Sequence, residues 1–169
     1  SMLSSDEEHE AAEKLRAVKL GRWKDEGQVM GPLINKKARD RMLELVDDAV
    51  KSGAKLVMGG EVPEEFAKGA YMTPALLVDV TDDMRVSKEE IFGPIIPMQP
   101  FKTLDEAIEK ANDTIYGLSS YFFGHNAKEI SKASSCFVLT TEIKFLSGLE
   151  PMNSNGAIIS MPSVNFTIG

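Results

Sequence analysis

The chain has 169 residues, of which 43% are apolar and 27% are charged, and its net charge is −7. These values are typical of one soluble globular domain and exclude a disordered chain. No basic patch is interleaved with aromatic residues, and no apolar run approaches the about 20 residues that cross a bilayer. Neither nucleic acid nor a membrane is therefore an expected partner.

The cysteine content and the first residues bear on the cellular compartment. Cys136 is the single cysteine, which excludes an internal disulfide and fits a reducing compartment. The first ten residues are acidic and polar, unlike a signal or transit peptide. We expect a cytoplasmic protein, and an organellar location stays open because a removed leader leaves no trace in these residues.

In residues 1–53 the sequence predicts a charged segment followed by an amphipathic helix. Residues 4–14 are typical of a charged helix start or a frayed arm, and we assign residues 1–14 as a charged N-terminal arm. Asn35 is a candidate helix N-cap and Gly53 a candidate C-terminal glycine. Apolar residues recur between them at helical spacing, at Met42, Leu45, Val46 and Ala49.

Three short strands follow this helix. Residues 54–58 predict a buried strand that ends at the turn Gly59-Gly60. Residues 71–80 predict a second strand, and residues 95–98 a third.

The C-terminal half continues the alternation of helices and strands. Thr103 and Glu106 have the spacing of a capping box, residues 118–123 predict a strand, and Asn126 opens a short helix to about residue 134. This alternation favours a mostly parallel sheet covered on both faces. We therefore predict a fold of the α/β class with three αβα layers.

The last part of the chain has a different character. Residues 136–146 are rich in β-branched and aromatic side chains, and residues 151–169 carry no charge. An uncharged terminal segment is rarely solvated, so it is buried, paired with a partner or cut from a larger domain. The last two alternatives are favoured equally, which makes the segment a candidate homo-oligomer interface.

The motif Glu89-Glu90-Ile91-Phe92-Gly93-Pro94 lies directly before the third predicted strand. It resembles the nicotinamide-side cofactor motif of the aldehyde dehydrogenase superfamily. In that family the second Glu contacts the nicotinamide ribose hydroxyls, and the Phe lies beside the ring. The resemblance implies that Glu90 and Phe92 contact NAD or NADP.

Further motifs follow in the order that the family shows. They occupy residues 31–35, 53–55, 59–60, 71–74, 105–107, 111–114 and 116–118. The resemblance breaks at residues 134–147, which look like a divergent insertion. It resumes at residues 155–160, which are similar to a segment of the succinate-semialdehyde dehydrogenase branch. We therefore assign residues 15–169 as a partial catalytic domain, the C-terminal part of that of an aldehyde dehydrogenase.

The resemblance also implies which parts of the chemistry lie elsewhere. Aldehyde oxidation needs a cysteine thiolate, donors for the developing oxyanion and a general base. In the family these groups and the dinucleotide-binding domain precede the matched region. We expect a truncated fragment of an NAD(P)-dependent enzyme that converts aldehydes to carboxylates, inactive alone and a weak binder of the cofactor. The alternative is a non-catalytic, enzyme-derived interaction or oligomerisation module.

Other reactive side chains give weaker signals. Cys136 has no adjacent base or cation to lower its pKa, which favours a buried structural cysteine over a nucleophile. His9 lies among acidic residues, but adjacent helical residues do not share a face, so a solvated helix start is favoured over a metal site. We therefore assign no catalytic and no metal-binding residue, only the cofactor contacts Glu90 and Phe92.

Overall fold

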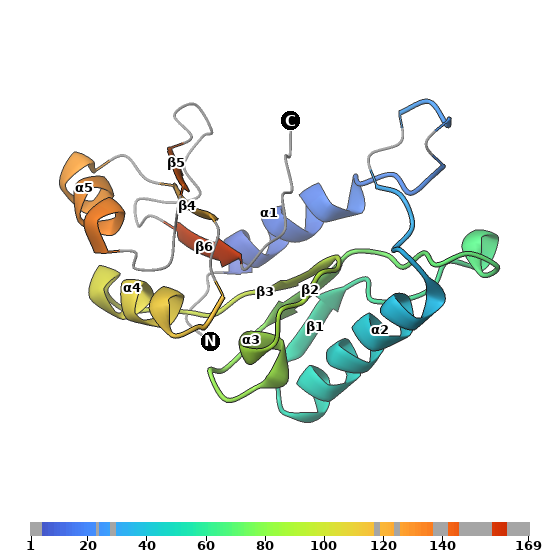
Figure 1. Cartoon of the computed structure of the whole chain (residues 1–169), viewed down its shortest axis with the longest axis horizontal. Coiled ribbons are helices and arrows are strands. Elements are labelled where there is room, and N and C mark those ends of the chain that lie inside the picture. Colours follow the sequence, from blue (N-terminus) through green and yellow to red (C-terminus); the bar gives the residue numbers. More distant parts are fainter. Residues whose placement is uncertain are drawn as a thin grey trace. The chain divides into compact units, whose positions relative to one another are not determined.

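The computed structural model describes residues 5–22, 24–27, 30–116, 119–123, 126–136, 142–145 and 157–161. The chain divides into two compact units, Ser1–Pro100 and Phe101–Gly169, and each contains a three-stranded sheet (Figure 1). The first unit contains α1 (Ser5–Arg16), α2 (Lys36–Lys51), β1 (Lys55–Met58), the 3-10 turn η1 (Glu64–Phe66), β2 (Ala75–Val78), α3 (Arg85–Lys88) and β3 (Ile95–Pro97). The second contains α4 (Leu104–Asn112), β4 (Ser119–Phe123), α5 (Ala127–Cys136), β5 (Glu142–Phe145) and β6 (Ala157–Met161).

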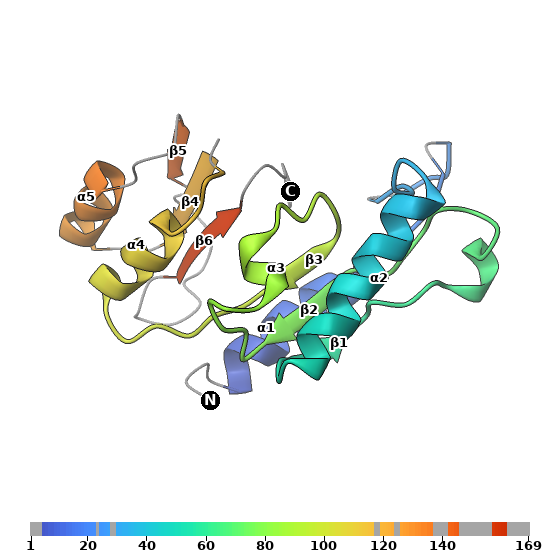
Figure 2. The same cartoon turned by 60° about the horizontal axis from the view of Figure 1, so that its bottom comes forward.

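Strand β2 is the centre of the first unit, in a sheet of order β1-β2-β3. All of its residues are buried, and successive side chains point to opposite faces. Ala75 and Leu77 belong to the cluster that contains the apolar face of α2, whereas Leu76 packs with Ala12 and Leu15 of α1. The two helices thus cover opposite faces of the sheet (Figure 2), which confirms the predicted α/β class and its three layers in this unit.

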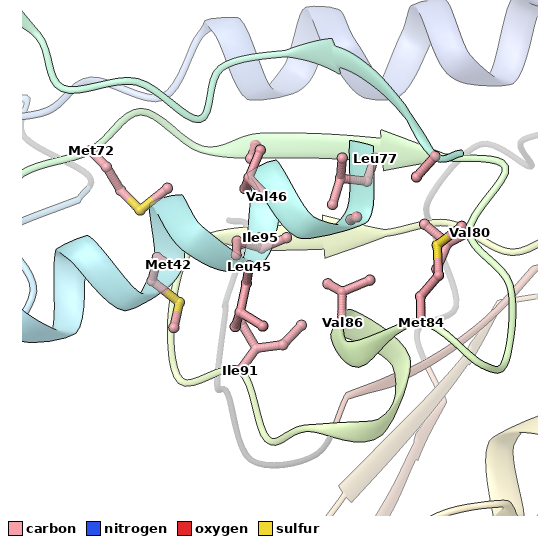
Figure 3. Close-up of a cluster of buried hydrophobic side chains, with 13 residues drawn as sticks. Met42, Leu45, Val46, Met72, Leu77, Val80, Met84, Val86, Ile91 and Ile95 are labelled. Carbon is pink, nitrogen blue, oxygen red and sulfur yellow. The ribbon is translucent and has the colours of Figure 1, made fainter. Parts of the chain in front are cut away.

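Helix α2 forms where the sequence predicts it. The Asn35 Oδ1 atom accepts a hydrogen bond from the Ala38 amide at 2.8 Å, which confirms the N-cap. All members of the predicted apolar stripe are buried, and Figure 3 shows Met42 and Leu45 within the core cluster of this unit. After the helix the chain turns at Gly53, whose φ is +109°, a conformation that suits glycine.

The sheets are mixed, which corrects the expectation of mostly parallel strands. The β2–β3 and β4–β5 pairs are parallel, whereas the β1–β2 and β4–β6 pairs are antiparallel. Parallel neighbours need a crossover connection, usually a helix. Residues 59–74, between β1 and β2, contain only the short turn η1, so β2 returns antiparallel.

Strand β1 is also less buried than predicted. It lies at an edge of its sheet, and Lys55 and Leu56 are exposed. Gly59 and Gly60 follow with φ of +71° and +74°, but they do not form the predicted turn, because the Gly60 amide donates to the Thr73 carbonyl at 3.3 Å and the chain continues beside residues 73–74.

The second unit begins with a capped helix, as predicted. The Glu106 amide donates to Thr103 Oγ1 at 3.2 Å, while the Glu106 carboxylate accepts from the Lys102 amide at 2.9 Å. At the start of α5, Asn126 Oδ1 accepts from the Lys128 amide at 3.0 Å. The described part of the second sheet has the order β5-β4-β6, so β6 is an edge strand there.

Two sequence assignments concern the division of the chain. The boundary between residues 14 and 15 and the divergent insertion at residues 134–147 stay predictions. None of the described helices is both long and apolar enough to cross a membrane.

Candidate cofactor-contact site

The candidate site is the loop of residues 89–94, which connects α3 to β3. At its start the Glu89 amide donates to the Arg85 carbonyl at 2.8 Å. At its end the Pro94 carbonyl accepts from the Ala75 amide, also at 2.8 Å, which ties the loop to β2. Between these anchors the side chain of Ile91 is buried in the core cluster (Figure 3).

Phe92 is the most unusual residue of the loop. The residue is 62% exposed although it follows the buried Ile91 directly. Its φ is +48°, in the left-handed region, where a bulky side chain is a genuine outlier. Such a conformation costs about 1–3 kcal/mol and persists only where the surroundings enforce it. The loop therefore holds the ring outward against the local preference of the backbone.

Gly93 brings the loop close to helix α2. A Cβ atom at this position would lie 2.1 Å from Met42 Sδ and 2.6 Å from Met42 Cγ. Met42 is itself buried, so its side chain has little room to move away. The glycine thus lets the loop pack directly on the helix.

Arg41 of α2 binds three consecutive residues of the loop. Its Nη1 atom donates to the Ile91 carbonyl at 3.0 Å, and its Nη2 atom donates to the Glu90 carbonyl at 3.0 Å. The Nη2 atom also donates to Glu89 Oε2 at 3.1 Å. The planar guanidinium, with five donors in a fixed fork, suits such a set of acceptors.

Glu89 is shared between two arginines. Its Oε1 atom accepts from Arg85 Nε at 2.7 Å, and Arg85 Nη1 also donates to Glu44 at 3.1 Å. The hydrogen bond from Arg85, and then that from Arg41, lower the pKa of Glu89 below its ordinary value, against the opposing effect of burial. The pKa of Arg85 is raised by its hydrogen bonds to Glu89 and Glu44. Glu89 is therefore an ionised anchor of the loop at neutral pH.

Glu90 and Phe92, the two predicted site residues, thus lie on one anchored loop. Their contact with a cofactor stays a prediction. Sequence reasoning missed Arg41, because its loop partners lie 48 to 50 residues further along the chain. The pairing of Arg85 with Glu89 could have been predicted from the sequence, because the two residues have the i,i+4 spacing of a helical ion pair.

The other candidate groups lie outside this loop. Cys136 is the last residue of α5 and not the start of a strand, and its carbonyl accepts from Asn112 Nδ2 at 2.8 Å. His9 Nε2 is 3.4 Å from Glu13 Oε1, and both side chains are exposed. His125, which the sequence predicts in a turn at the surface, lies outside the described residues. Within the described part of the chain, no group of three or more His, Cys, Asp and Glu could hold a metal ion.

Known proteins match most of the chain. The profile of the Aldehyde dehydrogenase family matches residues 5–139, which include the loop. Betaine aldehyde dehydrogenase of Brucella anthropi is 39% identical over 134 residues, which are 75% of this chain and 28% of that protein.

Solved structures show the same fold. Lactaldehyde dehydrogenase from Escherichia coli matches with a TM-score of 0.76 and 36% identity, over 88% of this chain and 31% of that one. Betaine aldehyde dehydrogenase from Staphylococcus aureus, in complex with NAD+, matches with a TM-score of 0.76 and 29% identity, over 82% of this chain and 28% of that one. The chain thus spans less than a third of the length of these relatives.

Proposed function

Because the chain belongs to the aldehyde dehydrogenase family, we propose that its loop 89–94 forms the nicotinamide-side wall of an NAD(P)-dependent aldehyde-oxidising site. Glu90 accepts hydrogen bonds from the nicotinamide ribose hydroxyls, and Phe92 lies against the nicotinamide ring. The bound cofactor supplies the hydride acceptor for the oxidation. The observation that carries this proposal is the 62% exposure of Phe92, which has a left-handed backbone conformation and lies two residues after Glu90.

The residues of the loop suit such a ligand. A carboxylate offers acceptor sites on two oxygens, which matches the two adjacent hydroxyls of a ribose. An exposed aromatic face can stack on a planar ring, a contact worth about 0.5–1.5 kcal/mol beyond the area it buries. The anchors at Ile91 and Pro94 keep both groups in place before a ligand arrives. The loop therefore orients the nicotinamide and does not hold the whole dinucleotide.

We include in the proposal that these 169 residues do not oxidise aldehydes by themselves. Aldehyde oxidation needs a thiolate nucleophile. The single thiol, Cys136, ends helix α5, and its Sγ atom lies 3.8 Å from the Ser135 hydroxyl, a neutral group and not a base or cation that would favour the thiolate. Purified chain is expected to give no increase in NADH or NADPH absorbance with NAD+ or NADP+ and a series of short aldehydes. Aldehyde-dependent NADH or NADPH formation by the purified chain would overturn this part.

Cofactor contact is tested by titration with nicotinamide mononucleotide, followed by NMR of the amides. Weak binding is expected, with shifts centred on residues 90–92. Glu90→Gln and Phe92→Ala should each weaken it about tenfold, because each removes one contact worth about 1–2 kcal/mol. Glu65→Gln, at an exposed carboxylate of η1, is the matched control. Absence of binding, or equal loss in the control, contradicts the proposal.

The substrate of the complete enzyme is a further part of the proposal. The resemblance of residues 155–160 to the succinate-semialdehyde dehydrogenase branch favours a short semialdehyde. A fusion of this chain to the upstream part of a family member should then prefer succinate semialdehyde over uncharged aldehydes of similar length.

Self-association through the uncharged segment 151–169 is the second candidate function. The position of β6 at an edge of the described second sheet favours it, because an edge strand can pair with another chain. Sedimentation at increasing concentration is expected to show a dimer, and Ser160→Lys in β6 is expected to lower the dimer fraction. A monomer at all concentrations contradicts this candidate.

A further inference from the structure

The guanidinium of Arg41 binds the backbone of loop 89–94 as well as the charged carboxylate of Glu89. Two of its three hydrogen bonds end on the carbonyls of Glu90 and Ile91, at 3.0 Å each. These carbonyls belong to the peptide groups on either side of Ile91, which lies between the two predicted cofactor contacts, Glu90 and Phe92. A hydrogen bond to a carbonyl fixes the peptide plane, and therefore the direction in which the next side chain leaves the backbone.

Arg41 is itself held in a defined position. Its neighbour Met42 is buried in the core cluster, which fixes the helix beneath the loop. Its third bond ends on Glu89, whose other carboxylate oxygen is bound by Arg85 at 2.7 Å. The Arg41 side chain therefore joins a rigid helix to three successive loop residues, and its planar fork makes these bonds with little further loss of freedom.

The conformation of Phe92 requires such a restraint. Left-handed backbone at a bulky residue is unfavourable in isolation, so a free loop would relax toward negative φ and swing the ring away. The burial of Ile91 fixes one point of the loop. The two bonds to the Glu90 and Ile91 carbonyls fix the peptide planes on either side of Ile91.

We propose that Arg41 is a positioning residue for the nicotinamide-side contacts: its guanidinium, bound to the carbonyls of Glu90 and Ile91, keeps the Glu90 carboxylate and the Phe92 ring in the arrangement that receives the nicotinamide riboside. This inference rests on the proposed function of the loop. It adds a residue from another element, which touches no ligand itself.

The experiment uses the whole chain and two measurements. Backbone NMR order parameters report the rigidity of residues 90–92, and titration with nicotinamide mononucleotide reports binding. For Arg41→Gln the order parameters are expected to fall from about 0.85 to below about 0.6. The apparent dissociation constant should rise about tenfold, because only a fraction of the molecules then hold the binding arrangement.

Arg39→Gln is the matched control on the same helix. Arg39 Nη1 donates to the carbonyl of Gly69 at 3.0 Å, so this variant removes a comparable bond from a different loop. It is expected to lower the melting temperature by a similar amount and to leave both loop measurements unchanged. Arg41→Lys keeps the charge without the planar fork, and intermediate values are expected.

The outcomes separate the two proposals. Unchanged order parameters in Arg41→Gln overturn the positioning role, and so does an equal loss of binding in Arg39→Gln. If Arg41→Gln fails to fold, Arg41→Lys decides by the same measurements. If the unchanged chain does not bind nicotinamide mononucleotide, the proposed function fails, and the order parameters still decide whether Arg41 holds the loop.

Discussion

Two connections of equal length, residues 59–74 and 79–94, enter and leave the central strand β2. The first is closed by backbone contacts: the Gly60 amide donates to Thr73 at 3.3 Å, and the Thr73 amide donates to Glu61 at 2.8 Å. Arg39 adds one side-chain hydrogen bond to it, at the Gly69 carbonyl. The second connection is tied to β2 by the Pro94 carbonyl and is held by more side chains, through Arg41 and Arg85 and through Ile91 in the core. The first connection carries no residue of the candidate site, whereas the second carries both.

The difference shows two ways to order a long connection. Backbone closure leaves space for glycine only at Gly59, where an added Cβ atom would overlap the Pro74 carbonyl. Side-chain anchoring fixes the loop from outside, and the Phe92 side chain stays exposed. The predictions below separate these two modes, beginning with the largest expected effect.

The backbone-closed connection is broken most effectively at Gly59. A Cβ atom there would lie 1.6 Å from the Pro74 carbonyl oxygen, and the φ of +71° is itself unfavourable for alanine. Gly59→Ala is expected to lower the free energy of unfolding by about 3 kcal/mol or more, measured by urea titration. Gly53→Ala, where φ is +109° but no atom lies within 4 Å, is the control and should lose about 1 kcal/mol. Equal losses would show that the carbonyl contact adds nothing.

The second connection has its own close approach, at Gly93. Gly93→Ala is expected to cost about 2 kcal/mol, because the new methyl group overlaps the flexible but buried Met42. In a Met42→Ala background the same substitution should cost much less, since the overlapping atoms are gone. A double-mutant cycle in urea measures this coupling. Additive losses would contradict the packing of the loop on α2.

A mutation of the N-cap of helix α2 tests whether Arg39, which binds Gly69, and Arg41, which binds loop 89–94, act independently. Asn35→Ala removes the acceptor of the Ala38 amide and is expected to cost about 1 kcal/mol. Fraying of the first turn should reach Arg39 before Arg41, so NMR order parameters should fall near Gly69 more than at residues 90–92. Asn35→Ser, which keeps a capping oxygen, is the control. Equal loosening of both loops would show that the two anchors are not independent.

The smallest expected effect is the acid sensitivity of the second connection. The pKa of Glu89 is lower in the folded protein than its ordinary value, so the carboxylate stabilises the fold above about pH 4.5. This contribution is lost as the pH falls through the lowered pKa. Glu89→Gln should therefore be less stable than the unchanged chain near neutral pH and nearly equal to it at the acid end. Melting temperatures between about pH 6 and pH 3 test this, and a constant difference would contradict it.

Local signals predicted much of the fold. The N-caps at Asn35 and Thr103 and the buried stripe of α2 are confirmed because each depends on neighbours within a few residues. The sheet direction was not predictable in this way. Whether β2 runs with or against β1 depends on the path of residues 59–74, and their sequence gave no sign that a short turn replaces a crossover helix.

In the candidate site, too, the residues set by local sequence were predictable and the one set by distant contacts was not. Its motif placed Glu90 and Phe92 on one loop before β3, as the structure has them. Arg41 was not predictable, because a half-exposed arginine on an amphipathic helix is ordinarily read as solvated, and its partners are remote in sequence. Contacts between distant segments are set by the fold as a whole and leave no local pattern.

The left-handed φ of Phe92 has a consequence for the chirality of this position. A φ of +48° is the mirror image of the ordinary helical value, so it is the conformation that a D-amino acid adopts without strain. A chain made by chemical ligation with D-phenylalanine at position 92 could keep the loop path and relieve the unfavourable backbone. Its ring, however, would leave Cα in the direction that the hydrogen occupies in the natural residue. The handedness of this one residue thus couples the path of the loop to the direction of its aromatic face.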